Sequence, residues 1–156
     1  MVENINKILV FLFIIISTVV GQNTNVKTNT IYLEIGGNCV WYSINYEKEF
    51  IGDISPRIGI SLMPISGISN FGRKSDYQLI ATLIANHFFD LNTKSKIELG
   101  FGFAYCLGNV FPTTTFGYRY SPNDGGFIFK IAFTPLLDQK LFAVFPWFGI
   151  GLGFRF

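Results

Sequence analysis

The side chains that could carry chemistry are few and far apart in this sequence. His87 is the only histidine, and a serine hydrolase needs such a base within hydrogen-bond reach of its nucleophile. Beside Phe88 and Phe89, this histidine is typical of a membrane interface. One histidine with Cys39 and Cys106 is a poor ligand set for a metal, and no glycine-rich phosphate loop opens a helix. We therefore expect no enzyme, no metal site and no cofactor.

The two cysteines allow only one disulfide pairing. Cys39 and Cys106 fall on predicted strands that are not neighbours, and a disulfide spans at most about 7 Å between Cα atoms. We expect two buried free thiols.

Six charged residues form the second set of candidate functional groups. They alternate with an apolar stripe, so all of them fall on the opposite face of the predicted strands: Glu34, Arg57, Glu98, Arg119, Lys130 and Arg155. Glycines share this face and leave room for long side chains. Charges in a narrow interior must be paired to offset their desolvation. We favour a packed, salt-bridged network over a solvated surface, with Glu34 and Glu98 as candidate partners of Arg155.

Alternation with a period of two predicts the strands that position these charges. Eight segments show it, at residues 31–36, 40–47, 57–63, 77–89, 97–106, 114–120, 127–134 and 147–156. We expect Pro64 to end the third strand and residues 135–146 to form the last loop.

Two of these segments allow a second interpretation. Residues 30–47 form either a hairpin at Gly37-Asn38, which places Trp41 inward, or one long bulged strand. We favour the hairpin. Residues 77–89 fit both a strand and a helical stripe, and only the context favours a strand.

Composition indicates a chain that is exported and not nucleic-acid binding. The 156 residues are 17% aromatic and only 14% charged, which leaves a soluble protein of this size short of polar surface. A net charge of +2 without basic clusters excludes nucleic acid as a partner. Lys7 precedes an apolar run that ends at Val20, so we expect a cleaved signal peptide at 1–21. A retained anchor is the alternative, but a spanning helix needs roughly 20 apolar residues.

The last stretch, WFGIGLGFRF, shows the clearest polarity. Its even-numbered residues are all large and apolar, whereas glycines and Arg155 occupy the other face. An apolar face suits lipid, and a sheet can cross a bilayer only when it closes without an edge. We therefore predict an all-β fold, an eight-stranded antiparallel up-and-down transmembrane β-barrel over residues 22–156, in which this strand pairs with residues 31–36.

The stretches IYLEIGGN, IELGFGFAY, FGYRYSPNDGGFIFKIAFTP and WFGIGLGFRF resemble the small OmpA/OmpX-like outer-membrane β-barrel proteins of Gram-negative bacteria. The likeness covers nearly all of the expected mature chain and is to the single-domain kind without a periplasmic appendage. It implies that Gly151, Phe154 and Phe156 belong to a C-terminal signal for the outer-membrane barrel assembly machinery. Gly149 stands where the family has a polar residue.

The resemblance implies a monomer in the outer membrane, surrounded by lipid, with a structural or surface-interaction role. Two alternatives remain within the membrane, a small-solute pore and a lipid-modifying enzyme. His87 would lie near a periplasmic turn, away from the outer-leaflet substrate of the known enzymes. Eight strands leave an interior that side chains fill, so we expect little conductance. A secreted lipocalin-like carrier needs an apolar cavity, against which the charged face argues.

Overall fold

The computed structural model describes residues 28–50, 54–66, 75–106, 108–138 and 143–156. The predicted signal peptide at 1–21 lies outside the described residues. The strands are β1 (Asn29–Gly36), β2 (Tyr42–Lys48), β3 (Ile54–Ser66), β4 (Ser75–Asp90), β5 (Ser95–Cys106), β6 (Asn109–Tyr120), β7 (Gly126–Phe133), β8 (Leu136–Asp138), β9 (Ala143–Phe145) and β10 (Phe148–Arg155). A single turn of 3-10 helix, η1 (Gly37–Cys39), follows β1. Among the described residues, no helix has the length and apolar character needed to cross a membrane.

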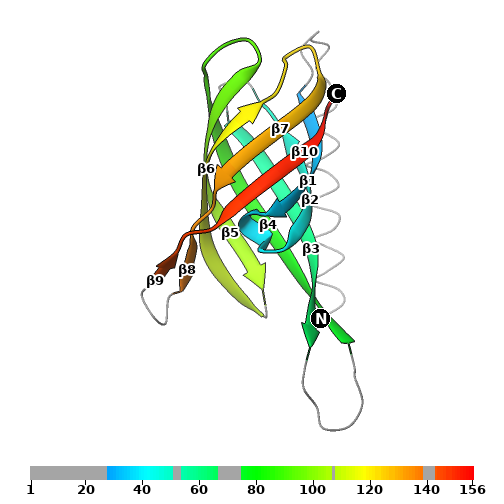
Figure 1. The fold of residues 1–156 in the computed structure, drawn as a ribbon, viewed down its shortest axis with the longest axis vertical. Coiled ribbons are helices and arrows are strands. Elements are labelled where there is room, and N and C mark those ends of the chain that lie inside the picture. Colours follow the sequence, from blue (N-terminus) through cyan, green and yellow to red (C-terminus); the bar gives the residue numbers. More distant parts are fainter. Residues whose placement is uncertain (1–27, 51–53, 67–74, 107, 139–142) are drawn as a thin grey trace.

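Eight of the strands form a closed barrel in the order β1-β10-β7-β6-β5-β4-β3-β2 (Figure 1). Each strand is antiparallel to both neighbours, and the predicted up-and-down barrel is therefore confirmed. β10 pairs with β1 from Thr30↔Arg155 to Gly36↔Gly149, which is the predicted closure. Reciprocal hydrogen bonds of 3.1 and 2.8 Å between the backbones of Asn29 and Phe156 extend this seam.

The two faces of the wall differ as the alternation predicts. On β5, Leu99, Phe101 and Phe103 are about half exposed on the outside, whereas Glu98 and Gly100 are buried inside. β10 has the same alternation of exposed and buried residues. Because successive side chains of a strand point to opposite faces, this arrangement gives an apolar outer surface and a polar interior.

Glycine allows close approach of neighbouring strands at several interior positions. A Cβ added at Gly153 would meet the backbone carbonyl oxygen of Ile31, and one added at Gly102 would meet that of Leu83. These contacts are with backbone, which cannot move aside as a flexible side chain can. The glycines on the inner face therefore set how closely the strands pack.

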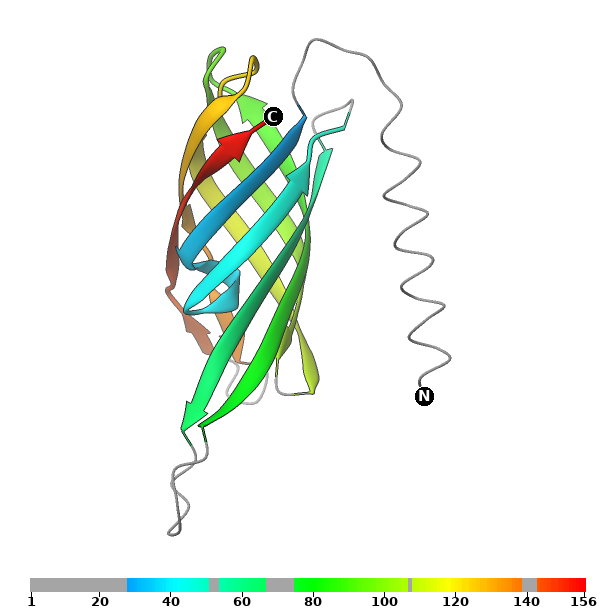
Figure 2. The same ribbon diagram turned by 90° about the vertical axis from the view of Figure 1, so that its right-hand side faces the viewer.

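The connection between β1 and β2 is a hairpin, but not the tight one predicted at Gly37-Asn38. The chain forms η1, continues through Val40 with a φ of 71°, and enters β2 only at Tyr42. Trp41, predicted to point inward, is 62% exposed. The longer connection allows η1 to fold into the barrel interior (Figure 2).

β3 and β4 are longer than predicted and extend beyond the other strands (Figure 2). Pro64 does not end β3, which pairs with β4 up to Ser66↔Ser75. β2 pairs only with residues 57–60 of β3. Beyond residue 60, the edge of β3 on that side has no described partner strand. Pro64 therefore leaves no hydrogen bond to β2 unmade by its lack of an N–H. Residues 67–74 lie outside the described residues.

Residues 77–89 form a strand, which confirms the favoured interpretation. Ile80, Ile84 and Phe88 are all buried in the interior. These residues are four positions apart. An even spacing places them on one face of a strand, and four residues make nearly one turn of a helix, so the same residues also fit a helical stripe. The predicted last loop at 135–146 contains the two-stranded sheet of β8 and β9, which the sequence did not indicate.

Candidate functional site: the charged interior of the barrel

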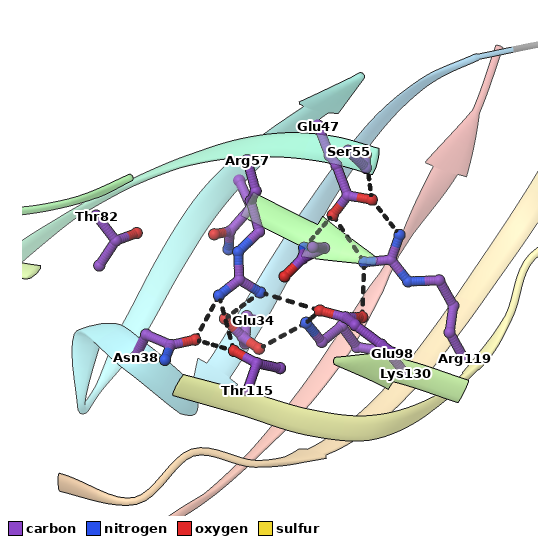
Figure 3. A network of polar contacts seen from close by, with 12 residues as sticks. Glu34, Asn38, Glu47, Ser55, Arg57, Thr82, Glu98, Thr115, Arg119 and Lys130 are labelled. Atoms are coloured by element: carbon purple, nitrogen blue, oxygen red, sulfur yellow. Dashed lines mark hydrogen bonds and ion pairs between the residues drawn. The ribbon is translucent and has the colours of Figure 1, made fainter. Parts of the chain in front are cut away.

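Glu98 of β5 lies at the centre of a fully buried group of three cations (Figure 3). Its Oε1 accepts a hydrogen bond from Lys130 Nζ at 2.8 Å and lies 3.6 Å from Arg57 Nη1. Its Oε2 lies 3.0 Å from Arg119 Nη2. The cations come from β3, β6 and β7, so one carboxylate joins four strands across the interior.

Two further carboxylates balance the charge of these cations. Glu47 of β2 accepts hydrogen bonds from Arg119 at 2.6 and 2.9 Å, a bidentate geometry that strengthens such a pair. Glu34 of β1 lies 3.5 Å from Lys130 Nζ and 4.0 Å from Arg57 Nη1. Three carboxylates therefore face three cations, and the desolvation of each charge is offset by an opposite charge.

Neutral side chains complete the packing around these charges. Ser55 and Asn86 donate hydrogen bonds of 3.0 and 3.1 Å to Glu47. The Tyr32 hydroxyl accepts one of 2.9 Å from Arg57. The Arg119 guanidinium also lies 4.7 Å from the ring centroid of Phe88, within the range of a cation–π interaction.

η1 closes the interior on the side of the β1–β2 connection. Asn38 is buried there, and its Nδ2 donates to Thr113 Oγ1 at 2.7 Å and to the Thr114 carbonyl at 3.0 Å, both on β6. Its Oδ1 accepts from Arg57 Nη2 and from Thr115 Oγ1. The amide of a single asparagine thus connects η1 to β6 on the other side of the interior and to the charged network.

A separate ionic cluster lies at the end of the barrel where the chain terminates. Arg155 Nη1 lies 2.8 Å from Glu49 Oε2, and Lys96 Nζ lies 2.6 Å from Glu49 Oε1. Lys96 also lies 3.5 Å from the exposed Asp90, and Arg155 donates to Ser121 at 3.2 Å. This cluster joins β10, β5 and the residue that follows β2.

The structure brings together five of the six charged residues singled out in the sequence: Glu34, Arg57, Glu98, Arg119 and Lys130. Arg155 is buried but pairs with Glu49 in the other cluster, so its predicted pairing with Glu34 and Glu98 is wrong. Arg155 lies at the end of β10 and pairs with Thr30, whereas Glu34 pairs with Gly151, four residues further along the strand.

Two further charged residues were not among the six candidates: Glu47 belongs to the network, and Lys96 belongs to the terminal cluster. Both have the same parity in their strands as the inward candidates, so alternation places them on the inner face. No such signal marked Asn38, because its position depends on how η1 folds. Of the proposed C-terminal signal, Gly151 is buried beside the Lys130 side chain, and Phe154 and Phe156 are 53% and 48% exposed on the outside.

The remaining chemistry-bearing side chains lie apart from the network. His87 packs edge-on against Phe89, with ring centroids 4.6 Å apart. Cys39 and Cys106 are both free; Cys39 is buried as expected, whereas Cys106 is partly exposed. No group of three or more His, Cys, Asp or Glu side chains within the described residues is placed to hold a metal ion.

A cavity of about 190 Å³ lies on the other side of η1 from the terminal cluster. Its lining is mainly apolar and comes from β4, β5, β6, η1, the residue after η1, and Pro135: Asn38, Val40, Ile80, Ala104, Cys106, Phe111, Pro112, Thr113 and Pro135. The interior therefore has a charged middle and an apolar compartment near the β5–β6 connection.

No protein-family model and no curated protein sequence matches the chain. Its structure is similar to the crystal structure of Ail, the attachment invasion locus protein of Yersinia pestis, with a TM-score of 0.51 and 12% sequence identity. The match covers 84% of this chain and 99% of that chain. At this identity, the likeness concerns the fold alone.

Proposed function

We propose that the chain is an integral outer-membrane β-barrel protein of a Gram-negative bacterium. The observation that carries this proposal is the inverted polarity of the barrel. Its largest fully buried side chains include Arg57, Arg119, Arg155 and Lys130, whereas every barrel strand exposes large apolar side chains. A soluble barrel would have the opposite arrangement, because apolar side chains leave water when they are buried. Lipid around the barrel accounts for both faces.

The packed interior supports a structural or surface-interaction role over a small-solute pore. The charged network joins opposite walls, and next to it Asn38 of η1 forms hydrogen bonds across the interior to β6. An ion would have to break buried ion pairs to pass. We expect no steady current from the purified protein in planar bilayers, and stable open-channel currents would refute this part of the proposal.

We also propose that the chain is an OmpA/OmpX-like protein with a surface-interaction role. The fold is similar to that of a protein named for attachment and invasion, and the long strands β3 and β4 project from the end of the barrel opposite the C-terminus (Figure 2). This projection supports contact with the surroundings. The chain acts as a monomer, without enzymatic activity, and its assembly depends on the machinery that reads Gly151, Phe154 and Phe156.

Cell fractionation and gel mobility test the location and the barrel together. The protein should fractionate with outer membranes, and unboiled samples should migrate differently from boiled ones because a closed barrel resists unfolding by detergent. A point variant that breaks closure, Gly153→Arg, should lose the unboiled band and serves as a control. A soluble periplasmic protein with identical mobility before and after boiling would refute the proposal.

A further inference from the structure

The barrel has a short side and a tall side. β2, β1, β10 and β7 are neighbours in the wall and have 7, 8, 8 and 8 residues. The other four neighbours, β6, β5, β4 and β3, have 12, 12, 16 and 13 residues. The additional length of β3 and β4 lies at the end opposite the C-terminus (Figure 2). The rim at this end is therefore lower over β1 and β2 than over β3 and β4.

The strands of the short side end at one level. β1 leaves the wall after Gly36, because the chain then forms η1 in the interior. Gly36 pairs with Gly149, the second residue of β10. The pairing of β7 with β10 ends at Phe133↔Phe148, and beyond this pair the chain forms the separate sheet of β8 and β9 (Figure 1). The low rim is thus set by two independent features of the chain.

Prolines and tryptophans mark the low rim. β8 and β9 continue the register of β7 and β10, which places Pro135 opposite Pro146. Neither proline has an N–H, so the ladder has no donor at this position. The Gly36 N–H donates to the Trp41 carbonyl at 2.7 Å, and the Thr134 N–H donates to the Trp147 carbonyl at 2.8 Å. Both tryptophans of the chain therefore lie at this rim, and tryptophan is enriched at membrane–water interfaces.

The apolar outer surface is correspondingly short over β1 and β2. Each of these strands has only three exposed residues in its outward row: Ile31, Leu33 and Ile35 on β1, and Tyr42, Ile44 and Tyr46 on β2. On β4, the exposed row extends from Tyr77 to Phe89. A strand of eight residues tilted by 45° rises roughly 19 Å along the barrel axis, whereas the apolar band of an outer-membrane barrel is about 25 Å tall. The short side is thus too short for an undeformed bilayer.

We propose that the outward face of β1 and β2 is a surface for a locally thinned bilayer, in which lipid head groups are drawn to the level of Trp41. The inference rests on the proposed membrane location. A wall shorter than the surrounding hydrocarbon thins the bilayer, extends basic side chains to the head groups, or associates with another protein. Residues 36–41 and 146–149 contain no lysine or arginine, so this rim has no long basic side chain for that purpose. Trp41, which is exposed, favours the interface, and the bilayer adapts to it.

Depth-dependent fluorescence quenching tests the thinning. Full-length variants with a single tryptophan are reconstituted into dioleoylphosphatidylcholine vesicles that contain a phosphatidylcholine brominated either near the head group or near the end of the acyl chain. Trp147→Phe leaves Trp41 as the probe of the low rim. Tyr46→Trp, in a background with both native tryptophans replaced by phenylalanine, probes the other end of β2. Leu83→Trp in the same background is the matched control, because Leu83 lies in the middle of the exposed row of β4.

The two probes on the short side should both be quenched more by the shallow bromines, whereas Leu83→Trp should be quenched more by the deep ones. Positions 41 and 46 differ in height by roughly 12 Å, so in an undeformed core of about 30 Å they cannot both lie near an interface. If Tyr46→Trp gives no heat-modifiable barrel, Ile31→Trp replaces it, because Ile31 pairs with Tyr46.

Each other outcome has a distinct meaning. A probe on the short side that is as deep as Leu83→Trp would overturn the thinning and leave the membrane location intact. Weak quenching on the short side, together with strong quenching of Leu83→Trp, would also overturn it, because another protein surface would then cover β1 and β2. No quenching of any probe by either lipid, together with a soluble protein, would instead refute the proposed function.

Discussion

Replacement of Glu98 by glutamine should strongly destabilise the barrel, because it leaves the buried network with one positive charge in excess. In the folded protein, Glu98 balances Arg57, Arg119 and Lys130 together with Glu34 and Glu47. Removal of one partner of a buried ion pair costs about 3–5 kcal/mol. Each of the three cations retains one other carboxylate within 4.0 Å. We therefore expect a loss near the lower limit, about 3 kcal/mol of unfolding free energy.

Urea unfolding in detergent micelles or lipid vesicles, followed by tryptophan fluorescence and gel mobility, measures this loss. Asp90→Asn is the matched control, because it also removes one carboxylate beside a cation, but Asp90 is 56% exposed and should change stability by less than about 1 kcal/mol. The double variant Glu98→Gln with Lys130→Met restores the charge balance and should recover part of the stability. Equal unfolding free energies for Glu98→Gln and Asp90→Asn would refute the reasoning.

Three other predictions concern the closure of the barrel and its interior. Gly153→Ala places a methyl group against the backbone of β1 and should cost about 1–3 kcal/mol in the same unfolding assay, whereas Gly151→Ala meets side-chain atoms of Lys130 and Tyr32 and no backbone and should cost less; equal losses would contradict the role of backbone contact. Deletion of Phe156 removes the last hydrogen bonds of the closing seam and should lower the amount of assembled protein in outer-membrane fractions, and unchanged amounts would speak against both the seam and the assembly signal. In single-cysteine variants, a maleimide should react with Cys106 faster than with Cys39, which is 1% exposed inside the barrel, and the reverse order would mean that η1 does not stay in the interior.

Much of the fold could be read from the sequence because alternation is a local property of a strand. Ile97 to Cys106 already assigned each residue of β5 to one face, and the structure agrees. The same local rule could not set the ends of strands. Pro64 is tolerated in β3 because the neighbouring strand has already ended, and this depends on pairing that the sequence of β3 does not contain.

The sequence by itself determined the eight strands, their polarity and the closure of β10 on β1, because each follows from a period of two and from the need of a sheet in lipid to have no edge. Only the tertiary structure decided which inward charges meet. Parity places Arg155 and Glu98 on the same face, but their positions along the tilted strands place Arg155 beside Glu49. The inward fold of η1 and the partners of Asn38 likewise depend on contacts between residues more than 70 positions apart, and local patterning carries no information at that range.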